Sequence, residues 1–308
     1  MNDPSVAAGS SSDAGSGEGI VLANFGRSAL VQERSQSLHC GILGRQLRVV
    51  CGDRVLYRRQ TAGGAPAIAE VLPRSNVLER IDSRGRAEAV AANIQRLAVV
   101  IAPAPEPEWF IVDRYLAGAL LKDVDSLLIV NKFDLGLDSI AAQLSVYRAL
   151  NLPCFEISTK SASTLELVRA AIEGGATMLV GQSGVGKSSI INALIPDAAA
   201  QTAQLSKDAE GRHTTTTARR YQLNARTALI DAPGVRDFAP PAGFDRAAER
   251  GFAEIRAASA GCKFKDCRHF DEPNCAVRAA VAAGNVDARR YESYRRLLRL
   301  FESFAGNR

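Results

Sequence analysis

The chain has 308 residues, which is enough for about two or three domains. Hydrophobic residues make up 46% and charged residues 23% of it, a balance that excludes a chain disordered throughout. The net charge of +5 is compatible with a polyanionic partner without requiring one. No apolar run approaches the roughly 20 residues of a membrane-spanning helix, and the N-terminus lacks the layout of a secretory signal, so we expect no membrane association.

Residues 1–19 are nearly all small, polar or glycine, and we predict a disordered tail because such a segment buries too little apolar surface to offset the entropy of ordering. In the next segment, 20–88, glycine turns separate short β-prone runs, which predicts a small all-β barrel or sandwich. These runs lie at 19–22, 29–31, 46–50 and 54–57. Residues 20–86 contain eleven arginines and five acidic residues. This excess of positive charge fits a nucleic-acid-binding surface and, equally well, a solvated surface on a domain that only packs against the rest of the protein.

Strand and helix patterns alternate through the segment 89–245, which predicts a largely parallel α/β sheet covered on both faces. The expected buried strands are 97–102, 126–130, 153–157, 177–180 and 227–230. The expected helices are 111–122, 138–150 and 163–173.

A phosphate-binding loop is predicted at 181–188, where GQSGVGKS matches G-x-x-x-x-G-K-[ST] between an expected strand and a helix at 188–194. The glycines let backbone N–H groups converge on phosphate oxygens, and the helix N-terminus adds a positive dipole. Lys187 is expected to reach the β- and γ-phosphates, and the Ser188 hydroxyl to ligate Mg²⁺.

A guanine-binding motif is predicted at 131–134, where NKFD follows an apolar strand. The Asp134 carboxylate accepts hydrogen bonds from guanine N1–H and the exocyclic amine, which adenine cannot donate together, so it selects GTP over ATP. Lys132 is expected to lie over the base and Asn131 to join neighbouring loops. After the next strand, Ser158-Thr159-Lys160 offers a backbone N–H to guanine O6.

Two further segments complete the expected nucleotide site. The strand at 227–230 ends in Asp231, whose carboxylate could hold the metal through water, and the Gly234 amide could meet the γ-phosphate because glycine permits close approach. The loop at 211–217, GRHTTTT, fits a switch segment that completes the metal shell with triphosphate bound. The four threonines fit the start of a β-branched strand as well.

The motifs occur in an unusual order, because the guanine-binding segments precede the phosphate-binding loop, the switch and Asp231. Circular permutation explains this order, since chain termini often lie close together at a domain surface and rejoining them preserves the sheet. The chain then leaves the GTPase core shortly after Gly234 and enters the C-terminal segment 246–308.

That C-terminal segment contains Cys262-x4-Cys267-x-His269-x5-Cys275, which offers three thiolates and one imidazole. Such a set is typical of closed, tetrahedral structural zinc. A helical stretch follows, in which residues 278–308 hold seven arginines against three acidic residues.

From about residue 20 to 305 the layout resembles the ribosome small-subunit-dependent GTPase family, often called RsgA or YjeQ. The resemblance rests on the basic barrel, on the order NKFD, STK, GQSGVGKSS, GRHTTT and DAPG, and on the cysteine–histidine segment before a basic helix. It implies an N-terminal OB-fold domain, a circularly permuted P-loop GTPase domain and a mostly helical zinc domain. It also implies a monomeric, bacterial cytoplasmic factor that binds the 30S subunit and its 16S rRNA late in assembly, with GTP hydrolysis stimulated by the subunit. Thr159 departs from the alanine usual in this family.

Catalysis is expected to depend on Lys187, His213 and Thr215. Val235 stands where many GTPases place a water-orienting glutamine, so another group must position the water, either His213 or a ribosomal group. Related GTPases place the switch metal ligand at Thr215, and Thr214 and Thr216 remain alternatives. Magnesium is thus expected at Ser188, Thr215 and, through water, Asp231. The complete set of expected GTP contacts is Asn131, Lys132, Asp134, Ser158, Thr159, Lys160, Gly181, Gln182, Ser183, Gly184, Val185, Gly186, Lys187, Ser188, Ser189, Asp231 and Gly234.

Two other function classes stay open from the motifs alone. One is a stand-alone P-loop NTPase that acts on ATP or a small molecule, and nucleotide competition would distinguish it. The other is a non-catalytic RNA-binding scaffold with structural zinc, which measurements of phosphate release would distinguish.

Overall fold

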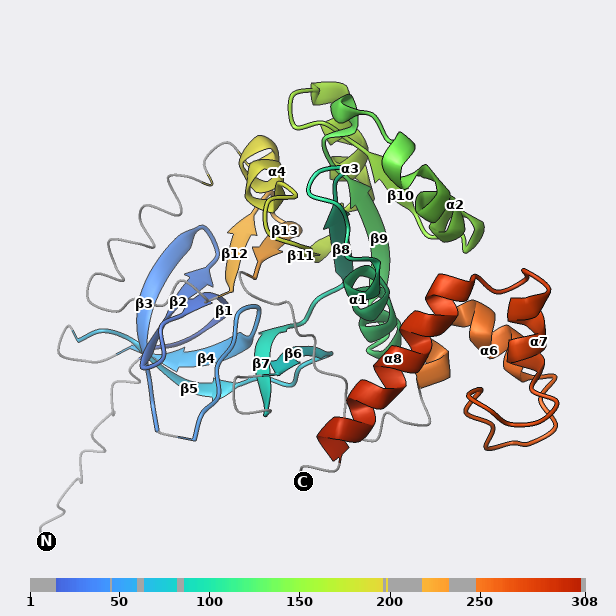
Figure 1. Cartoon of the computed structure of the whole chain (residues 1–308). Coiled ribbons are helices and arrows are strands. Elements are labelled where there is room, and N and C mark those ends of the chain that lie inside the picture. Colours follow the sequence, from blue (N-terminus) through green and yellow to red (C-terminus); the bar gives the residue numbers. More distant parts are fainter. Residues whose placement is uncertain are drawn as a thin grey trace, which may run out of the picture.

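The computed structural model describes residues 15–44, 46–59, 64–81, 86–195, 198, 218–232 and 248–305. Its N-terminal part is a closed five-stranded barrel (Figure 1). The strands are β1 (Ser16–Asn24), β2 (Ser28–Glu33), β3 (Gln36–Ile42), β4 (Arg54–Arg58) and β5 (Ala67–Val71). They pair in the order β1-β2-β3-β5-β4, and β4 returns to β1, which is the Greek-key closure of an OB-type barrel.

Two sequence predictions in this part are wrong. Because β1 begins at Ser16, residues 16–19 belong to the barrel and not to the predicted tail. The run at 46–50 is not a strand, because side chains bind its backbone instead of a neighbouring strand. Asn24 Nδ2 donates to the Val49 carbonyl at 2.5 Å, and the Val50 N–H donates to Asp53 Oδ2 at 2.7 Å.

A separate hairpin, β6 (Val77–Ile81) and β7 (Ala87–Ala92), connects the barrel to the central domain. The predicted domain boundary after residue 88 lies within β7. Gly52 of the barrel packs closely against this hairpin: a Cβ atom at position 52 would lie 2.2 Å from the Ala92 carbonyl oxygen.

The central sheet has the order β10-β9-β8-β11-β13-β12. Its strands are β8 (Arg96–Ile101), β9 (Asp125–Val130), β10 (Cys154–Glu156), β11 (Gly175–Val180), β12 (Arg219–Gln222) and β13 (Thr227–Asp231). All neighbours among the described strands pair in parallel except β12, which runs antiparallel to β13. Ala23 of β1 pairs with Arg219 of β12, so barrel and central sheet form one continuous sheet.

Helices cover both faces of the central sheet, as the apolar strands require. The helices α1 (Trp109–Leu121) and α2 (Ala141–Ala149) pack on one face, and α3 (Ala162–Ala171) and α4 (Lys187–Leu194) on the other. Two short 3₁₀ turns, η1 (Phe133–Leu135) and η2 (Asp138–Ile140), precede α2, so the helix predicted from 138 begins later. Along β8, Leu97, Val99 and Ile101 face the α1 side, and Ala98 and Val100 the opposite side.

The C-terminal part is helical and packs against α1, as Figure 1 shows. It contains η4 (Ala248–Gly251), α6 (Ala253–Ser259), α7 (Ala276–Ala282) and α8 (Ala288–Ala305). Barrel, permuted P-loop domain and helical cysteine-containing domain are thus present, which confirms the predicted fold class. None of the helices in the described ranges combines the length and apolar character that would let it span a membrane.

Candidate functional site

The loop 181–186 between β11 and α4 has backbone conformations that only glycine adopts without strain. Gly181 has φ of +142°, and a Cβ there would lie 2.2 Å from the Val100 carbonyl oxygen. Gly186 has φ of +98°, and a Cβ there would lie 2.3 Å from Asn131 Nδ2. These close approaches hold the loop against the end of β8 and the residue that follows β9, and the loop leads directly into the N-terminus of α4, where backbone N–H groups can bind an anion.

The guanine-binding motif lies directly against this loop. Asn131, which is buried, donates from Nδ2 to the Val185 carbonyl at 2.9 Å. Lys132 donates from Nζ to the Gly184 carbonyl at 2.7 Å and to the Ala104 carbonyl at 2.8 Å. Segments more than 50 residues apart in the chain therefore meet where one nucleotide would contact both.

Asp134 is paired with the second guanine-binding segment. Lys160 Nζ lies 2.9 Å from Asp134 Oδ2, and hydrogen bonds from Lys160 and Ser158 lower the pKa of Asp134, so the carboxylate stays charged at neutral pH. The Lys160 N–H donates to the buried Ser158 Oγ at 3.3 Å, which orders the loop around half-buried Thr159. Asp134 and the predicted base-contacting loop Ser158-Thr159-Lys160 thus lie together.

Lys187 lies across the phosphate-binding loop and donates to the carbonyls of Gly181 and Gln182, each at 2.8 Å. Asp231 lies at the end of β13, which pairs with β11, and its side chain is partly buried. Burial raises the pKa of Asp231, although the positive charges of Lys187 and Arg219 oppose the shift. The arrangement places one lysine and one carboxylate at the same edge of the sheet.

These residues fit a magnesium ion bound with a nucleotide triphosphate. The Ser188 hydroxyl is exposed at the first turn of α4, and Asp231 supplies the hard oxygen that Mg²⁺ prefers. Ser183 and Ser189 are exposed beside it. His213, Thr215, Gly234 and the rest of the predicted switch lie outside the described residues.

Gln182 has structural contacts that the sequence motif does not reveal. Its Oε1 accepts from the Glu108 N–H at 2.8 Å, and its Nε2 donates to the Glu106 carbonyl at 3.1 Å. The side chain therefore connects the phosphate-binding loop to the start of α1. No pattern in the sequence indicates this contact, because position 182 is variable in the motif.

The C-terminal cysteines and histidine converge on one point. The ligand atoms of Cys262, Cys267, His269 and Cys275 all lie within 4.8 Å of one another. His269 Nδ1 lies 3.3 Å from Cys275 Sγ and 3.5 Å from Cys262 Sγ. Burial raises the pKa of the Cys267 thiol to about 12, so a thiolate there needs a cation beside it. Three sulfurs and one imidazole in this geometry fit a structural zinc ion.

A buried ion network joins this helical domain to the central domain, and sequence reasoning missed it. Asp113 of α1 is almost fully buried and accepts hydrogen bonds from Arg289, Arg290 and the Tyr147 hydroxyl, each at 2.7 Å. Arg290 also donates to Glu254 of α6 at 2.6 Å. Burial opposes the charge of Arg290, yet the pKa of its guanidinium is raised because of Glu254 and Asp113.

Comparison with known proteins gives relatives over most of the chain. This chain is 39% identical over 295 residues to the small ribosomal subunit biogenesis GTPase RsgA of Azotobacter vinelandii. The alignment covers 91% of this chain and 84% of that protein. The protein of the same name from Pseudomonas putida is 37% identical over 290 residues, with the same coverage.

Solved structures share the whole architecture. YjeQ from Thermotoga maritima superposes with a TM-score of 0.69 and 25% identity over 93% of this chain and 98% of that chain. YloQ, described as a circularly permuted GTPase, gives a TM-score of 0.70 at 22% identity over 96% of this chain and 98% of that chain, which supports the fold alone. The family model RsgA GTPase matches residues 71–240. With the motifs assembled around one loop, the chain belongs to the RsgA GTPase family.

Proposed function

We propose that this protein is a GTPase that binds the small ribosomal subunit and acts in its maturation, with hydrolysis stimulated by the subunit. The observation that carries the proposal is the hydrogen bond from Asn131 to the Val185 carbonyl, because it joins a guanine-binding motif to a phosphate-binding loop. The names of the RsgA relatives support the ribosomal part.

In this proposal, the loop 181–188 binds the phosphates through its backbone N–H groups, and Lys187 exchanges its two carbonyl partners for phosphate oxygens. Ser188, and Asp231 through water, would hold Mg²⁺. The group that orients the attacking water is His213 or a ribosomal group, and Thr215 is the proposed switch ligand of the metal. Magnesium supplies charge neutralisation at the transferred phosphoryl group.

The remaining GTP contacts belong to the base and the surrounding loops. Asp134 accepts the guanine N–H groups, Lys132 lies over the base, and the loop Ser158-Thr159-Lys160 contacts O6. Asn131 positions these segments relative to the phosphate loop.

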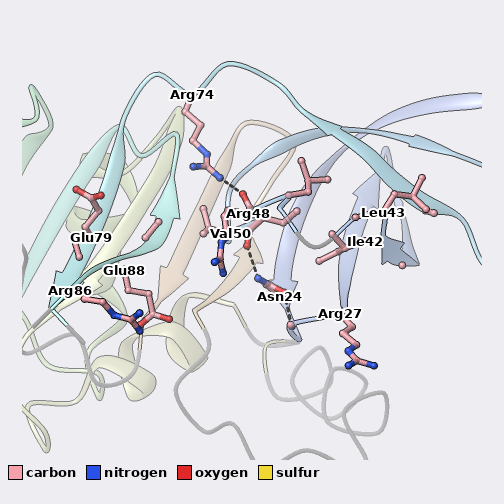
Figure 2. A pocket seen from close by; sticks show the side chains of 18 of the residues that line it. Asn24, Arg27, Ile42, Leu43, Arg48, Val50, Arg74, Glu79, Arg86 and Glu88 are labelled. Atoms are coloured by element: carbon pink, nitrogen blue, oxygen red, sulfur yellow. Dashed lines mark hydrogen bonds between the residues drawn. The ribbon is translucent and has the colours of Figure 1, made fainter. Parts of the chain in front are cut away.

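A groove between the barrel and the β6–β7 hairpin is the surface we propose for 16S rRNA (Figure 2). It encloses about 1430 Å³, more than a small-molecule pocket of roughly 300–1,000 Å³. Exposed Arg27 and Arg48 line it, and Arg74 is held by Asp53 at 2.6 Å. Arginines in a groove of this size suit the phosphates of a polynucleotide, and binding should weaken as salt rises. In this proposal the protein is a cytoplasmic monomer.

GTP turnover titrated with purified 30S particles tests the ribosomal part of the proposal. We expect slow hydrolysis by the protein alone and a saturable rise as 30S particles are added, measured as phosphate release. Particles of the large subunit at equal RNA concentration serve as the control. Turnover that does not respond to 30S particles would contradict the ribosomal part and leave the GTPase assignment intact.

Asp134→Asn tests the guanine-binding role. We expect GTP affinity to fall about 10- to 100-fold, because a charged acceptor is replaced by a neutral amide. Xanthosine triphosphate should bind better than to the parent protein, because xanthine carries an oxygen where guanine carries the amine and the asparagine amide can donate to it. Competition against a fluorescent GTP analogue measures both. Equal displacement by ATP and GTP in the parent protein would support the alternative of an unselective P-loop NTPase.

A further inference from the structure

The imidazole of His269 has a second partner opposite the cysteines. Its Nε2 lies 3.1 Å from Glu249 Oε1, while its Nδ1 faces Cys262 and Cys275. The His269 side chain is 1% exposed and that of Glu249 is 29% exposed. The carboxylate therefore reaches the ring from the outer side of the cysteine–histidine cluster.

The backbone around His269 leaves the ring little freedom. The residue has φ of +65°, and its carbonyl accepts a hydrogen bond from the Tyr291 hydroxyl. On either side, the N–H groups of Arg268 and Phe270 donate to Glu272, each at 2.8 Å. With the backbone held in this way, Nδ1 faces the cysteines, and the partner of Nε2 sets which ring nitrogen carries the proton.

From these contacts we propose that Glu249 is a positioning residue for the zinc site. It accepts the Nε2–H of His269 and thereby holds the tautomer in which Nδ1 carries the lone pair that binds zinc. An imidazole that binds metal through one nitrogen and donates to a carboxylate from the other has a fixed orientation and greater basicity. Glu249 precedes His269 by 20 residues and lies outside the cysteine–histidine pattern.

Glu249 belongs to η4, which lies outside the cysteine–histidine cluster and packs against α1 of the central domain. Gly251 of η4 lies so close to α1 that a Cβ there would be 2.7 Å from Ala117 Cβ. Phe252, next in the chain, is fully buried and packs edge-on against Tyr294 of α8 at 5.7 Å between ring centroids. The zinc site thus takes its outer carboxylate from a segment held between α1 and α8, and it is complete when the helical domain is docked.

Zinc affinity of the full-length protein tests this role. We expect Glu249→Ala to weaken zinc binding by about 10- to 100-fold, measured by competition with a colorimetric chelator. Glu249→Gln, whose amide oxygen still accepts from Nε2–H, should retain an affinity between those of the alanine variant and the parent. The matched control is Glu292→Gln, which removes a carboxylate from exposed α8 pairs with Arg295 and Arg299 and should leave zinc affinity unchanged.

The tautomer is read directly from long-range ¹H–¹⁵N NMR of the histidine rings in the zinc-loaded parent protein. We expect His269 to bind metal through Nδ1 and to carry its proton on Nε2. Zinc bound through Nε2 in the parent, or parent-like zinc affinity in Glu249→Ala, would overturn the proposal. Neither readout involves GTP or ribosomes, so the result is independent of the proposed function.

Discussion

Lys187→Ala is expected to lower the turnover of GTP by a factor on the order of 100 to 1,000. A loss of this size corresponds to the removal of one donor that stabilises the charge of the transition state. The side chain already reaches across the loop to the Gly181 and Gln182 carbonyls, so it is held above the place where phosphates bind. Phosphate release at saturating GTP, with and without 30S particles, measures the effect. Both rates should fall, because both depend on the positive charge of this lysine at the phosphates.

The control for this variant is Lys265→Ala, which removes an exposed lysine of equal charge from the cysteine–histidine segment. Its hydrolysis in the absence of ribosomes should equal that of the parent protein. If Lys187→Ala kept more than a tenth of the parent turnover, the phosphate-binding role of the loop 181–188 would be wrong.

Asp113→Ala is expected to destabilise the contact between the helical domain and α1 by about 3–5 kcal/mol, the usual cost of removing one partner of a buried ion pair. The substitution leaves Arg289 without its closest carboxylate and Arg290 with Glu254 alone. Trp109, the single tryptophan of the chain, lies under the Arg289 guanidinium at 5.5 Å and stacks with Tyr147 at 5.8 Å. Its fluorescence therefore reports on this contact during urea unfolding.

The matched control is Glu166→Gln, which breaks an exposed pair with Arg169 and should change the free energy of unfolding by less than about 1 kcal/mol. If Asp113→Ala unfolds at the same urea concentration as this control, the buried network does not stabilise the domain contact. A shift confined to the tryptophan signal, with the barrel unchanged, would show that the helical domain separates first.

The sequence was sufficient wherever function depends on a short contiguous motif. The loop 181–188, the NKFD segment and the four zinc-binding positions are each local patterns, because phosphate, guanine and zinc require particular side chains at short, fixed spacing. The strand predictions in the central sheet also rest on local patterns, because its buried strands are continuous apolar runs. The strand prediction failed at 46–50, where Asn24 and Asp53 take the backbone hydrogen bonds that a neighbouring strand would have taken.

By itself, therefore, the amino-acid order determined the P-loop GTPase class, the permutation and the four cysteine and histidine side chains that fit a zinc ion. Only the folded chain decided that Asn131 meets Val185, that Gln182 holds the start of α1, that Asp113 lies between Arg289 and Arg290, and that Glu249 faces His269. These contacts join residues 20 to 177 positions apart, and their single polar side chains have no periodicity or motif of their own. Their partners are set by how helices and loops pack, which no local pattern encodes.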